Sequence, residues 1–371
     1  MVTALLQNRM RFNHGSTMSN KSDDLKQLMD EFGDKPGALP FSRLYAFSDL
    51  AGQRLADFCA TLDTLPTVQR LRLVEALVEF AEASFQVNFD AIFRHCLADP
   101  DEHVRAKAID GLWEAEDHAL IGPFLAMLRS DPSARVRAAA ANGLGRFVLD
   151  GELEKLEAVV EARILTELLT TIHGAEESIE VRRRAIESVG YACTPEALEA
   201  LDLAYDDEDD MMRLSAIVGM GRSCDKRWKD IVIAELANPS PAMRYEAAQA
   251  AGGLDLREAV PDLIQLFDDP DPQVRDATIW SLGQIGGQRA REALLAAYPD
   301  ADEDTQALLD EALAEQALFD DDMGFLLYEL DEEDEDLIDD ELDEEDEDFN
   351  ADELWAEDEE DDETDQDDWE L

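Results

Sequence analysis

Apolar side chains recur along most of the chain at the spacing of amphipathic helices. Segments such as Ala119–Arg129, Ala197–Tyr205 and Ala259–Phe267 place their apolar residues on one side of a helix. Each of these segments is followed by a second amphipathic segment of similar length. The pattern therefore predicts helical hairpins of about 31 residues, within the range of repeats that stack into helical solenoids.

The second segment of each hairpin carries the same phrase. An acid or Asn, often followed by Pro, stands six positions before an Arg, and Val or Met precedes that Arg. A small residue follows three positions after the Arg, and most copies have Gly eight positions after it. Successive Arg residues are 32, 45, 31, 31 and 31 positions apart. The acid and Arg positions are Asp99 and Arg105, Asp131 and Arg137, Glu176 and Arg182, Asp207 and Arg213, Asn238 and Arg244, and Asp269 and Arg275, with a degenerate earlier copy at Arg70.

Each part of the phrase has a physical role. The Asp or Asn side chain is expected to cap free N–H groups at the start of the helix, and Pro suits the first helical position. The small residue lets the paired helix approach closely. The Gly either allows tight packing near the helix end or serves as a C-cap.

The interval of 45 residues interrupts the period. Residues 147–174 add about 14 residues with helical apolar spacing. We expect either an elongated helix or an additional one. Such an insertion lies on one face of a solenoid, where it either packs against its neighbours or contributes to binding.

The two ends differ from the repeats. Residues 1–17 are interpreted as a disordered extension or a misassigned start, and 18–64 as an N-terminal helical cap with helices at Ser22–Phe32 and Asp49–Leu62. Pro66 opens one helical stretch that is predicted to reach Phe93. The predicted solenoid spans 65–318, with about seven hairpins and a final helix at Asp302–Leu318, and 319–371 form an acidic low-complexity tail.

The repeated phrase resembles the HEAT-like repeats of bacterial proteins related to phycobilisome lyases, within the armadillo-like superfamily. The resemblance covers roughly residues 65–315 and implies an all-α fold, an α-solenoid built from helical hairpins. It also implies that repeat acids and Arg side chains form a ladder between neighbouring hairpins, in a register left open, rather than a ligand site. The residues of this ladder are Asp99, Arg105, Asp131, Arg137, Arg182, Asp207, Arg213, Arg244, Asp269 and Arg275.

Charge separates the tail from the rest of the chain. The formal net charge is −58, and 40 of the 89 acids follow Arg291, after which no Lys or Arg occurs. From Asp320 onward, 32 of 52 residues are acidic, with aromatic residues such as Phe349 and Trp355 between them. Four roles are open for such a segment: it solubilises the protein, binds a partner, folds back on the solenoid, or weakly buffers cations. The charge argues against nucleic acid and membranes as partners.

Motifs for catalysis are missing. The sequence contains no phosphate-binding loop and no G-x-S-x-G. Deoxyhypusine hydroxylases, enzymes with HEAT-like repeats, bind iron through His-Glu pairs. None of His14, His95, His103, His118 and His173 is followed by Glu. We therefore expect no catalytic residues, no cofactor and no metal site.

Aromatic and Arg residues at or near the second helix of several hairpins are the candidates for binding a protein partner. They are Trp113, Arg146, Tyr191, Arg222, Trp228, Tyr245 and Trp280, with Phe349 and Trp355 in the tail. For each of the seven solenoid residues, the alternative is a structural role in packing between hairpins. The sequence predicts a monomeric, non-enzymatic scaffold in the cytoplasm. Its concave face is expected to bind a protein partner, with basic proteins among the candidates, and the acidic tail is expected to modulate that binding. The alternatives are a chaperone or decoy for basic proteins, and a lyase or oxidoreductase.

Overall fold

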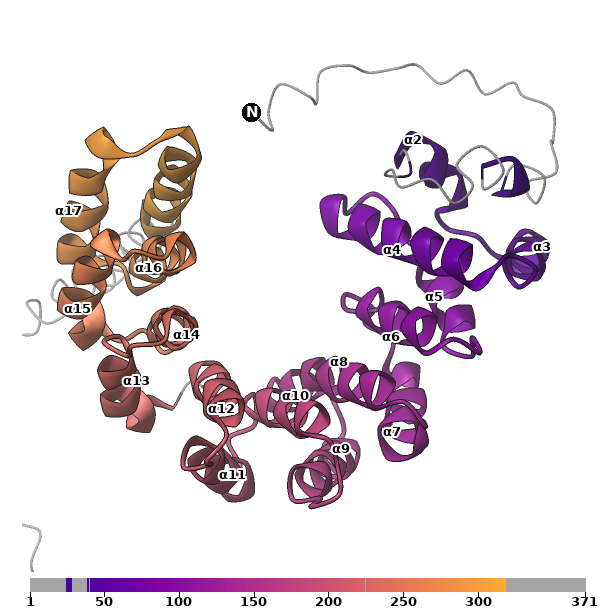
Figure 1. The fold of residues 1–371 in the computed structure, drawn as a ribbon, viewed down its shortest axis with the longest axis horizontal. Helices are drawn as coiled ribbons and strands as arrows, with labels where there is room; N and C mark the ends of the chain where they lie inside the picture. The colour runs from indigo at the N-terminus through magenta and orange to yellow at the C-terminus, as the bar shows by residue number, and fades with distance from the viewer. Residues whose placement is uncertain (1–24, 29–38, 40, 224, 318–371) are drawn as a thin grey trace, which may run out of the picture. The chain divides into compact units, whose positions relative to one another are not determined.

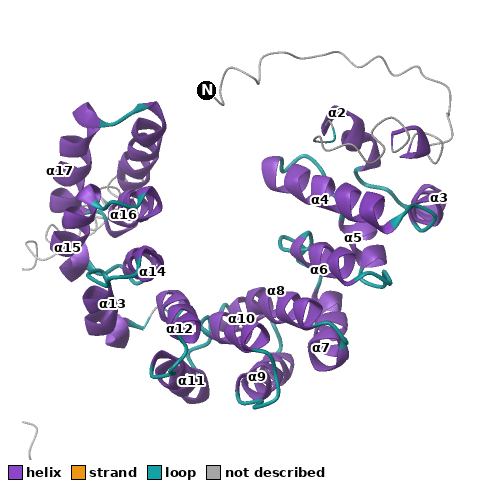
Figure 2. Ribbon diagram, in the orientation of Figure 1, coloured by secondary structure: helices purple, strands orange, loops and turns teal. Residues whose placement is uncertain are grey.

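The computed structural model describes residues 25–28, 39, 41–223 and 225–317. Contacts between Cα atoms divide the chain into a unit at Met1–Gln316, which contains helices α2 to α17, and a second unit at Ala317–Leu371. Every regular element in the described ranges is a helix (Figure 2). The predicted all-α solenoid is therefore confirmed.

Consecutive helices pack as hairpins. Helices α2 (Phe41–Leu44), α3 (Gly52–Leu62) and α4 (Thr67–Ala83) precede them. The pairs are α5 (Asp90–Cys96) with α6 (Glu102–Asp110), α7 (Ile121–Ser130) with α8 (Ala134–Glu152), α9 (Ala158–Ile172) with α10 (Ile179–Val189), α11 (Pro195–Tyr205) with α12 (Asp210–Arg222), α13 (Lys229–Glu235) with α14 (Pro241–Gly253), and α15 (Val260–Gln265) with α16 (Pro272–Ile285). Helix α17 (Gly287–Ala297) and a helix at 303–317 follow.

The two helices of each hairpin belong to two rows. We call the first helix of a hairpin the A helix and the second the B helix. Helix α4 and the B helices α6, α8, α10, α12, α14 and α16 contact one another in chain order, as Figure 1 shows. The A helices flank this row on one side, which leaves the other side of each B helix for the surface of the unit.

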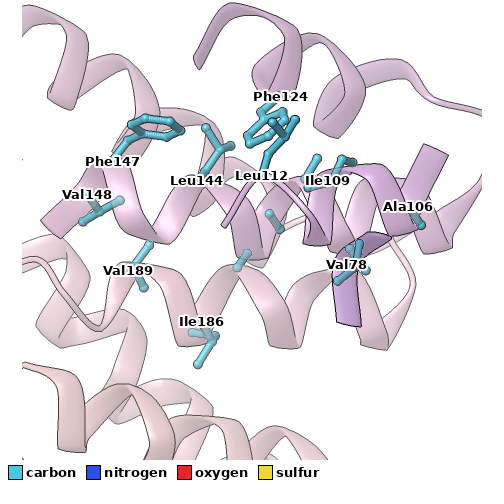
Figure 3. Close-up of a cluster of buried hydrophobic side chains, with 14 of the residues drawn as sticks. Val78, Ala106, Ile109, Leu112, Phe124, Leu144, Phe147, Val148, Ile186 and Val189 are labelled. Atoms are coloured by element: carbon cyan, nitrogen blue, oxygen red, sulfur yellow. The ribbon is translucent and has the colours of Figure 1, made fainter. Parts of the chain in front are cut away.

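The apolar stripe of the repeat forms the core between the rows. The residue before each repeat Arg and the small residue after it are fully or almost fully buried, as at Val104 and Ala108 or Val136 and Ala140. Figure 3 shows how side chains from α4, α6, α7, α8 and α10 meet in one such cluster. One side chain there is Phe147, whose ring centroid lies 6.3 Å from that of Phe124. Stacking thus continues one core from repeat to repeat.

The N-cap of each B helix lies two residues after the repeat acid, which corrects the predicted capping role. The side chain of Asp99 accepts a hydrogen bond from the N–H of Asp101 at 2.8 Å. Asp101 is the N-cap, and its side chain accepts from the N–H groups of His103 and Val104. Pro100 consequently stands before the helix and not at its first position. The repeat acid shapes the turn that presents the cap.

The repeat Gly serves helix packing. A Cβ atom on Gly190 would lie 2.5 Å from the Cα of Gly219, and one on Gly221 would lie 2.7 Å from the Cα of Ala250. Neither distance leaves room for a side chain, because backbone atoms cannot move aside. Both predicted roles occur: these glycines allow close approach of neighbouring B helices, and Gly190 is also the C-cap of α10.

The interruption of the period lengthens the second helix of one hairpin and the first helix of the next. Helix α8 has 19 residues and α9 has 15, against 11 in α11 and 13 in α12. The extra residues add turns to these helices and do not form a separate one. Helix α9 packs against α7 and α11, and Glu167 on α9 forms an ion pair with Arg129 on α7.

The N-terminal region differs from one prediction. The helical stretch predicted from Pro66 to Phe93 is wrong, because α4 ends at Ala83 and α5 begins at Asp90. The connecting residues are held from outside: the N–H of Asn88 donates to the Ser48 hydroxyl at 3.0 Å, and its carbonyl accepts from the N–H of Asp49 at 2.9 Å. The helix expected at 22–32 is described only at 25–28. The predictions for 1–17 and for the tail beyond 317 concern residues outside the described ranges.

Candidate protein-binding surface

The repeat Arg residues connect neighbouring hairpins in one register: the Arg of one repeat pairs with the acid of the next. Arg105 makes two hydrogen bonds to the Asp131 carboxylate, at 3.0 Å and 2.8 Å, and its Nη1 donates to the carbonyl of Asp99 in its own repeat at 2.9 Å. The same paired geometry joins Arg70 to Asp99 and Arg244 to Asp269. We call each of these pairs a rung.

The remaining ladder residues depart from this geometry. Arg137 makes the same paired contact, at 2.7 Å and 2.9 Å, but to Glu177, which follows the repeat acid Glu176. The rung between Arg182 and Asp207 is looser, at 3.9 Å. Arg213 pairs with Asp210 on its own helix, and Arg275 donates to the carbonyl of Asp269.

Six of the seven solenoid residues proposed for binding line two pockets on the B-helix row. The first pocket, of about 910 Å³, includes Trp113, Arg146, Tyr191 and Arg222. The second, of about 500 Å³, includes Arg222, Tyr245 and Trp280. Arg222 therefore lines both, and we call the surface formed by these two pockets the B-face.

The B-face carries two exposed indole rings and one contact between a guanidinium and an aromatic ring. Trp113 is 53% exposed, and its carbonyl accepts from Arg146 Nη1 at 2.8 Å. The Arg222 guanidinium lies over the Tyr191 ring, 5.1 Å from its centroid, while Arg222 Nη1 donates to the Glu187 carbonyl. Trp280 is 41% exposed. Trp and Tyr side chains have only two rotatable bonds, so they lose little entropy on binding and are suited to act as anchors.

A network of charges lies beneath the second pocket. Glu187 is buried and accepts from the Ser215 hydroxyl at 2.7 Å and from Arg184 at 2.8 Å. Nearby Glu246 is half-buried, and this burial raises the pKa of its carboxyl above the ordinary value, with the charge of Glu187 adding to the shift. Arg222 and Arg184 oppose that shift. This part of the B-face thus combines satisfied ion pairs with the Glu246 carboxylate, which burial partly removes from water.

Trp228 does not belong to this surface. The side chain is 2% exposed, and the indole N–H donates to the Ser223 hydroxyl at 3.1 Å. It lies in a 3-10 helix at Lys226–Trp228 that precedes α13, an A helix. Of the two roles left open for Trp228, packing between hairpins is the one the structure shows, because the ring fills the core between the rows. Phe349 and Trp355 lie outside the described residues.

The sequence reasoning missed a smaller pocket beside the B-face. It has a volume of about 420 Å³ and shares Trp113, Glu114 and Glu116 with the first pocket. Phe85, from the connection between α4 and α5, lines it and is 89% exposed. No Gly or Pro marks that connection in the sequence, so the pattern gave no signal of a loop there.

The histidines are dispersed. His95 bonds Asp63 at 2.8 Å, and His118 lies 3.5 Å from Asp150. Across the part of the chain that the structure describes, no group of three or more His, Cys, Asp or Glu residues is arranged to hold a metal ion. None of the helices described there combines the length and the apolar character needed to cross a membrane.

Comparison with known proteins identifies the repeats. A family model for HEAT repeats matches residues 90–171 and 229–314. A deoxyhypusine hydroxylase of Candida albicans is 22% identical over 210 residues, and the match spans 51% of this chain and 65% of that relative.

Two solved structures illustrate the wider likeness. YibA of Escherichia coli is 17% identical, with a TM-score of 0.39 over 66% of this chain and 95% of YibA. A chain of the Kap95:Nup1 complex is 14% identical, with a TM-score of 0.42 over 79% of this chain and 46% of that chain. The finer resemblance to phycobilisome-lyase repeats stays a prediction. Because the family model falls on the stacked hairpins joined by Arg–acid rungs, the chain is a HEAT-repeat protein that folds as an α-solenoid.

Proposed function

We propose that the protein is a non-enzymatic scaffold that binds a protein partner on the B-face. The acidic tail modulates this binding, and the setting is the cytoplasm. The observation that carries the proposal is the gathering of Trp113, Arg146, Tyr191, Arg222, Tyr245 and Trp280 around two pockets that share Arg222.

Three properties of the B-face support this function. The pockets continue from one repeat to the next, which suits an extended partner segment. The anchoring rings are of the types that dominate the binding energy of interfaces. The lining mixes both charges, with Arg183, Arg184 and Arg222 beside Glu187 and Glu246 in the second pocket, so that a partner is selected by its charge pattern.

The test is a pull-down from cell extract with the full chain and three variants. Arg222→Glu and Trp280→Ala change the B-face. Leu203→Ala is the matched control, because Leu203 is a large apolar side chain that is 56% exposed on the A helix α11. We expect a specific partner that the wild type and Leu203→Ala retain and both B-face variants lose. A partner retained equally by all four proteins would contradict the B-face as the binding site.

The contribution of the tail is tested by the same pull-down without residues 320–371. We expect the partner to remain bound with altered affinity. If the partner is lost only when the tail is removed, the tail itself is the binding site, as in a chaperone or decoy for basic proteins. In that case raising the salt concentration releases the partner steeply, because exposed charges are screened.

An enzymatic function is the second candidate, favoured by the distant match to deoxyhypusine hydroxylase. Against it, none of the five histidines is followed by Glu, whereas the family pairs these residues to hold iron. Metal analysis of the protein purified without chelators decides between the two. Stoichiometric iron would overturn the non-enzymatic proposal.

A further inference from the structure

The pocket beside the B-face, which we call the Phe85–Trp113 pocket, exposes two aromatic side chains that pack poorly with the rest of the molecule. Phe85 is 89% exposed and Trp113 is 53% exposed. A Phe ring left almost wholly in water has an unfavourable free energy of solvation of its own, which contact with a partner would relieve. The pocket volume of about 420 Å³ lies within the range of known ligand pockets.

The polar part of the lining carries one sign of charge. Asp49, Asp90, Glu114 and Glu116 line the pocket, and the described lining residues include no Lys, Arg or His. The first pocket of the B-face differs, because Lys107, Arg146 and Arg222 stand among its acids. Complementarity to the Phe85–Trp113 pocket therefore requires a cation.

One of these carboxylates is held in an unfavourable environment. Asp90 is half-buried, and its pKa is raised above the ordinary value by this burial. The charges of Arg94 and Arg146 oppose the shift and that of Asp117 adds to it. A cation in the pocket would stabilise the charged form of Asp90.

The frame of the pocket is fixed by hydrogen bonds and by a strained residue. Asp49 has a positive φ of 54°, which is uncommon outside Gly. Its N–H donates to the Asn88 carbonyl, and the Ser48 hydroxyl accepts from the Asn88 N–H. The backbone of Trp113 is held at two points: its carbonyl accepts a hydrogen bond from Arg146, and its backbone N–H donates to the Asp110 carbonyl. Strain of this kind persists where the surroundings over-determine the backbone, and it accumulates at binding sites.

We propose that the Phe85–Trp113 pocket binds an arginine side chain of a basic peptide segment in the protein partner. The inference rests on the proposed function, because it names the chemistry that the partner presents next to the B-face. The planar guanidinium stacks on an aromatic face and bonds carboxylates in pairs, which a lysine ammonium does not do. The Phe85 and Trp113 rings supply the faces, and Asp90, Glu114 and Glu116 supply the carboxylates.

The probe is a short, end-blocked diarginine peptide flanked by glycines, titrated calorimetrically into the full chain at physiological salt. The same peptide with glutamine or lysine in place of arginine is the comparison. The acidic tail also attracts cations, so the protein variants keep the tail. The aromatic variant is Phe85→Ala with Trp113→Ala, and the charge variant is Asp90→Asn with Glu116→Gln. Both aromatic positions are exposed, and Arg146 bonds only the backbone of Trp113, so folding is expected to persist.

The matched charge control removes two acids elsewhere. Glu196→Gln with Glu199→Gln lies on the A helix α11, outside the pocket. We expect the diarginine peptide to bind the aromatic variant about tenfold more weakly than the wild type, which corresponds to loss of the cation–π contacts. The charge variant is expected to bind the peptide about as weakly as the aromatic variant, whereas the α11 control binds it like the wild type. The conservative variant Trp113→Phe, with Phe85 intact, keeps most of the wild-type affinity.

Three results would overturn the inference. One is a diarginine peptide that binds the aromatic variant as tightly as the wild type, or binds neither. Another is equal loss in the α11 control, which would mean non-specific attraction by net charge. The third is equal affinity for the lysine peptide. A partner lost with Trp280→Ala but indifferent to the aromatic variant would leave the B-face function standing and remove only this inference.

Discussion

At the scale of single residues, the repeat Arg combines two tasks that tie neighbouring hairpins together. In Arg244, Nε and Nη2 hold the Asp269 carboxylate at 2.7 Å and 2.8 Å, while Nη1 donates to the Asn238 carbonyl at 2.8 Å. The hydrogen bond from Arg244 holds the pKa of Asp269 below its ordinary value. A Lys side chain lacks the forked donor geometry for both tasks, which explains why Arg fills this position where a rung forms.

Removal of one rung should therefore cost much more than removal of an exposed ion pair. Arg105→Ala leaves Asp131 without its partner, and the side chains of this pair are only 12% and 9% exposed. We expect a loss of about 2–4 kcal/mol in the free energy of unfolding. Urea unfolding followed by circular dichroism measures it.

The matched control is Arg213→Ala. Arg213 occupies the same repeat position, but its pair with Asp210 is 39% and 85% exposed. The expected loss is about 0–1 kcal/mol. Equal losses in both variants would contradict the structural role of the rungs.

At the scale of the helices, close contact between B helices depends on positions that cannot carry a side chain. Gly190→Ala would place a Cβ atom 2.5 Å from the Cα of Gly219, so α10 and α12 must separate. We expect a loss of about 1–3 kcal/mol in the free energy of unfolding. Gly122→Ala near the start of α7 has nothing within 4 Å of the new Cβ and should be neutral or slightly stabilising. Thermal unfolding of both variants checks this, and similar midpoints would show that α10 and α12 are not in tight contact.

The sequence predicted the helices of the repeats because their pattern recurs in phase. It did not predict the register of the rungs. The same sequence pattern results whether each Arg pairs with the acid of its own repeat or with the acid of the following repeat. The use of Glu177 instead of Glu176 depends on the turn after α9, where neighbouring acids are equivalent in sequence.

One open alternative, at Trp228, and one wrong prediction, the helical stretch from Pro66 to Phe93, have the same physical origin. Trp228 stands next to charged residues in the sequence yet is buried, because a 3-10 turn directs its ring into the core. The break between α4 and α5 is imposed by hydrogen bonds from Ser48 and Asp49, which are distant in sequence. Tertiary contacts of this kind carry no local signal, and the Phe85–Trp113 pocket escaped prediction for that reason.

At the scale of the whole repeat unit, each hairpin contacts its neighbours in the chain and the rungs follow the same order. Stability in such arrays is close to a sum of repeat terms and nearest-neighbour terms. Damage at one interface should therefore remain local. This locality lets the B-face keep its shape while a distant repeat changes.

Two rungs near opposite ends of the row provide the test. Arg70 pairs with Asp99 between α4 and α6, and Arg244 pairs with Asp269 between α14 and α16. We expect the losses from Arg70→Ala and Arg244→Ala to add in the double variant within about 0.5 kcal/mol. Arg105→Ala with Asp131→Ala should fall well short of additivity, because both substitutions remove the same rung.

Hydrogen exchange resolved by segment should show Arg70→Ala weakening protection in α4 and α6 while α14 and α16 keep theirs. Loss of protection throughout the unit would instead mean that the hairpins unfold as a single cooperative block.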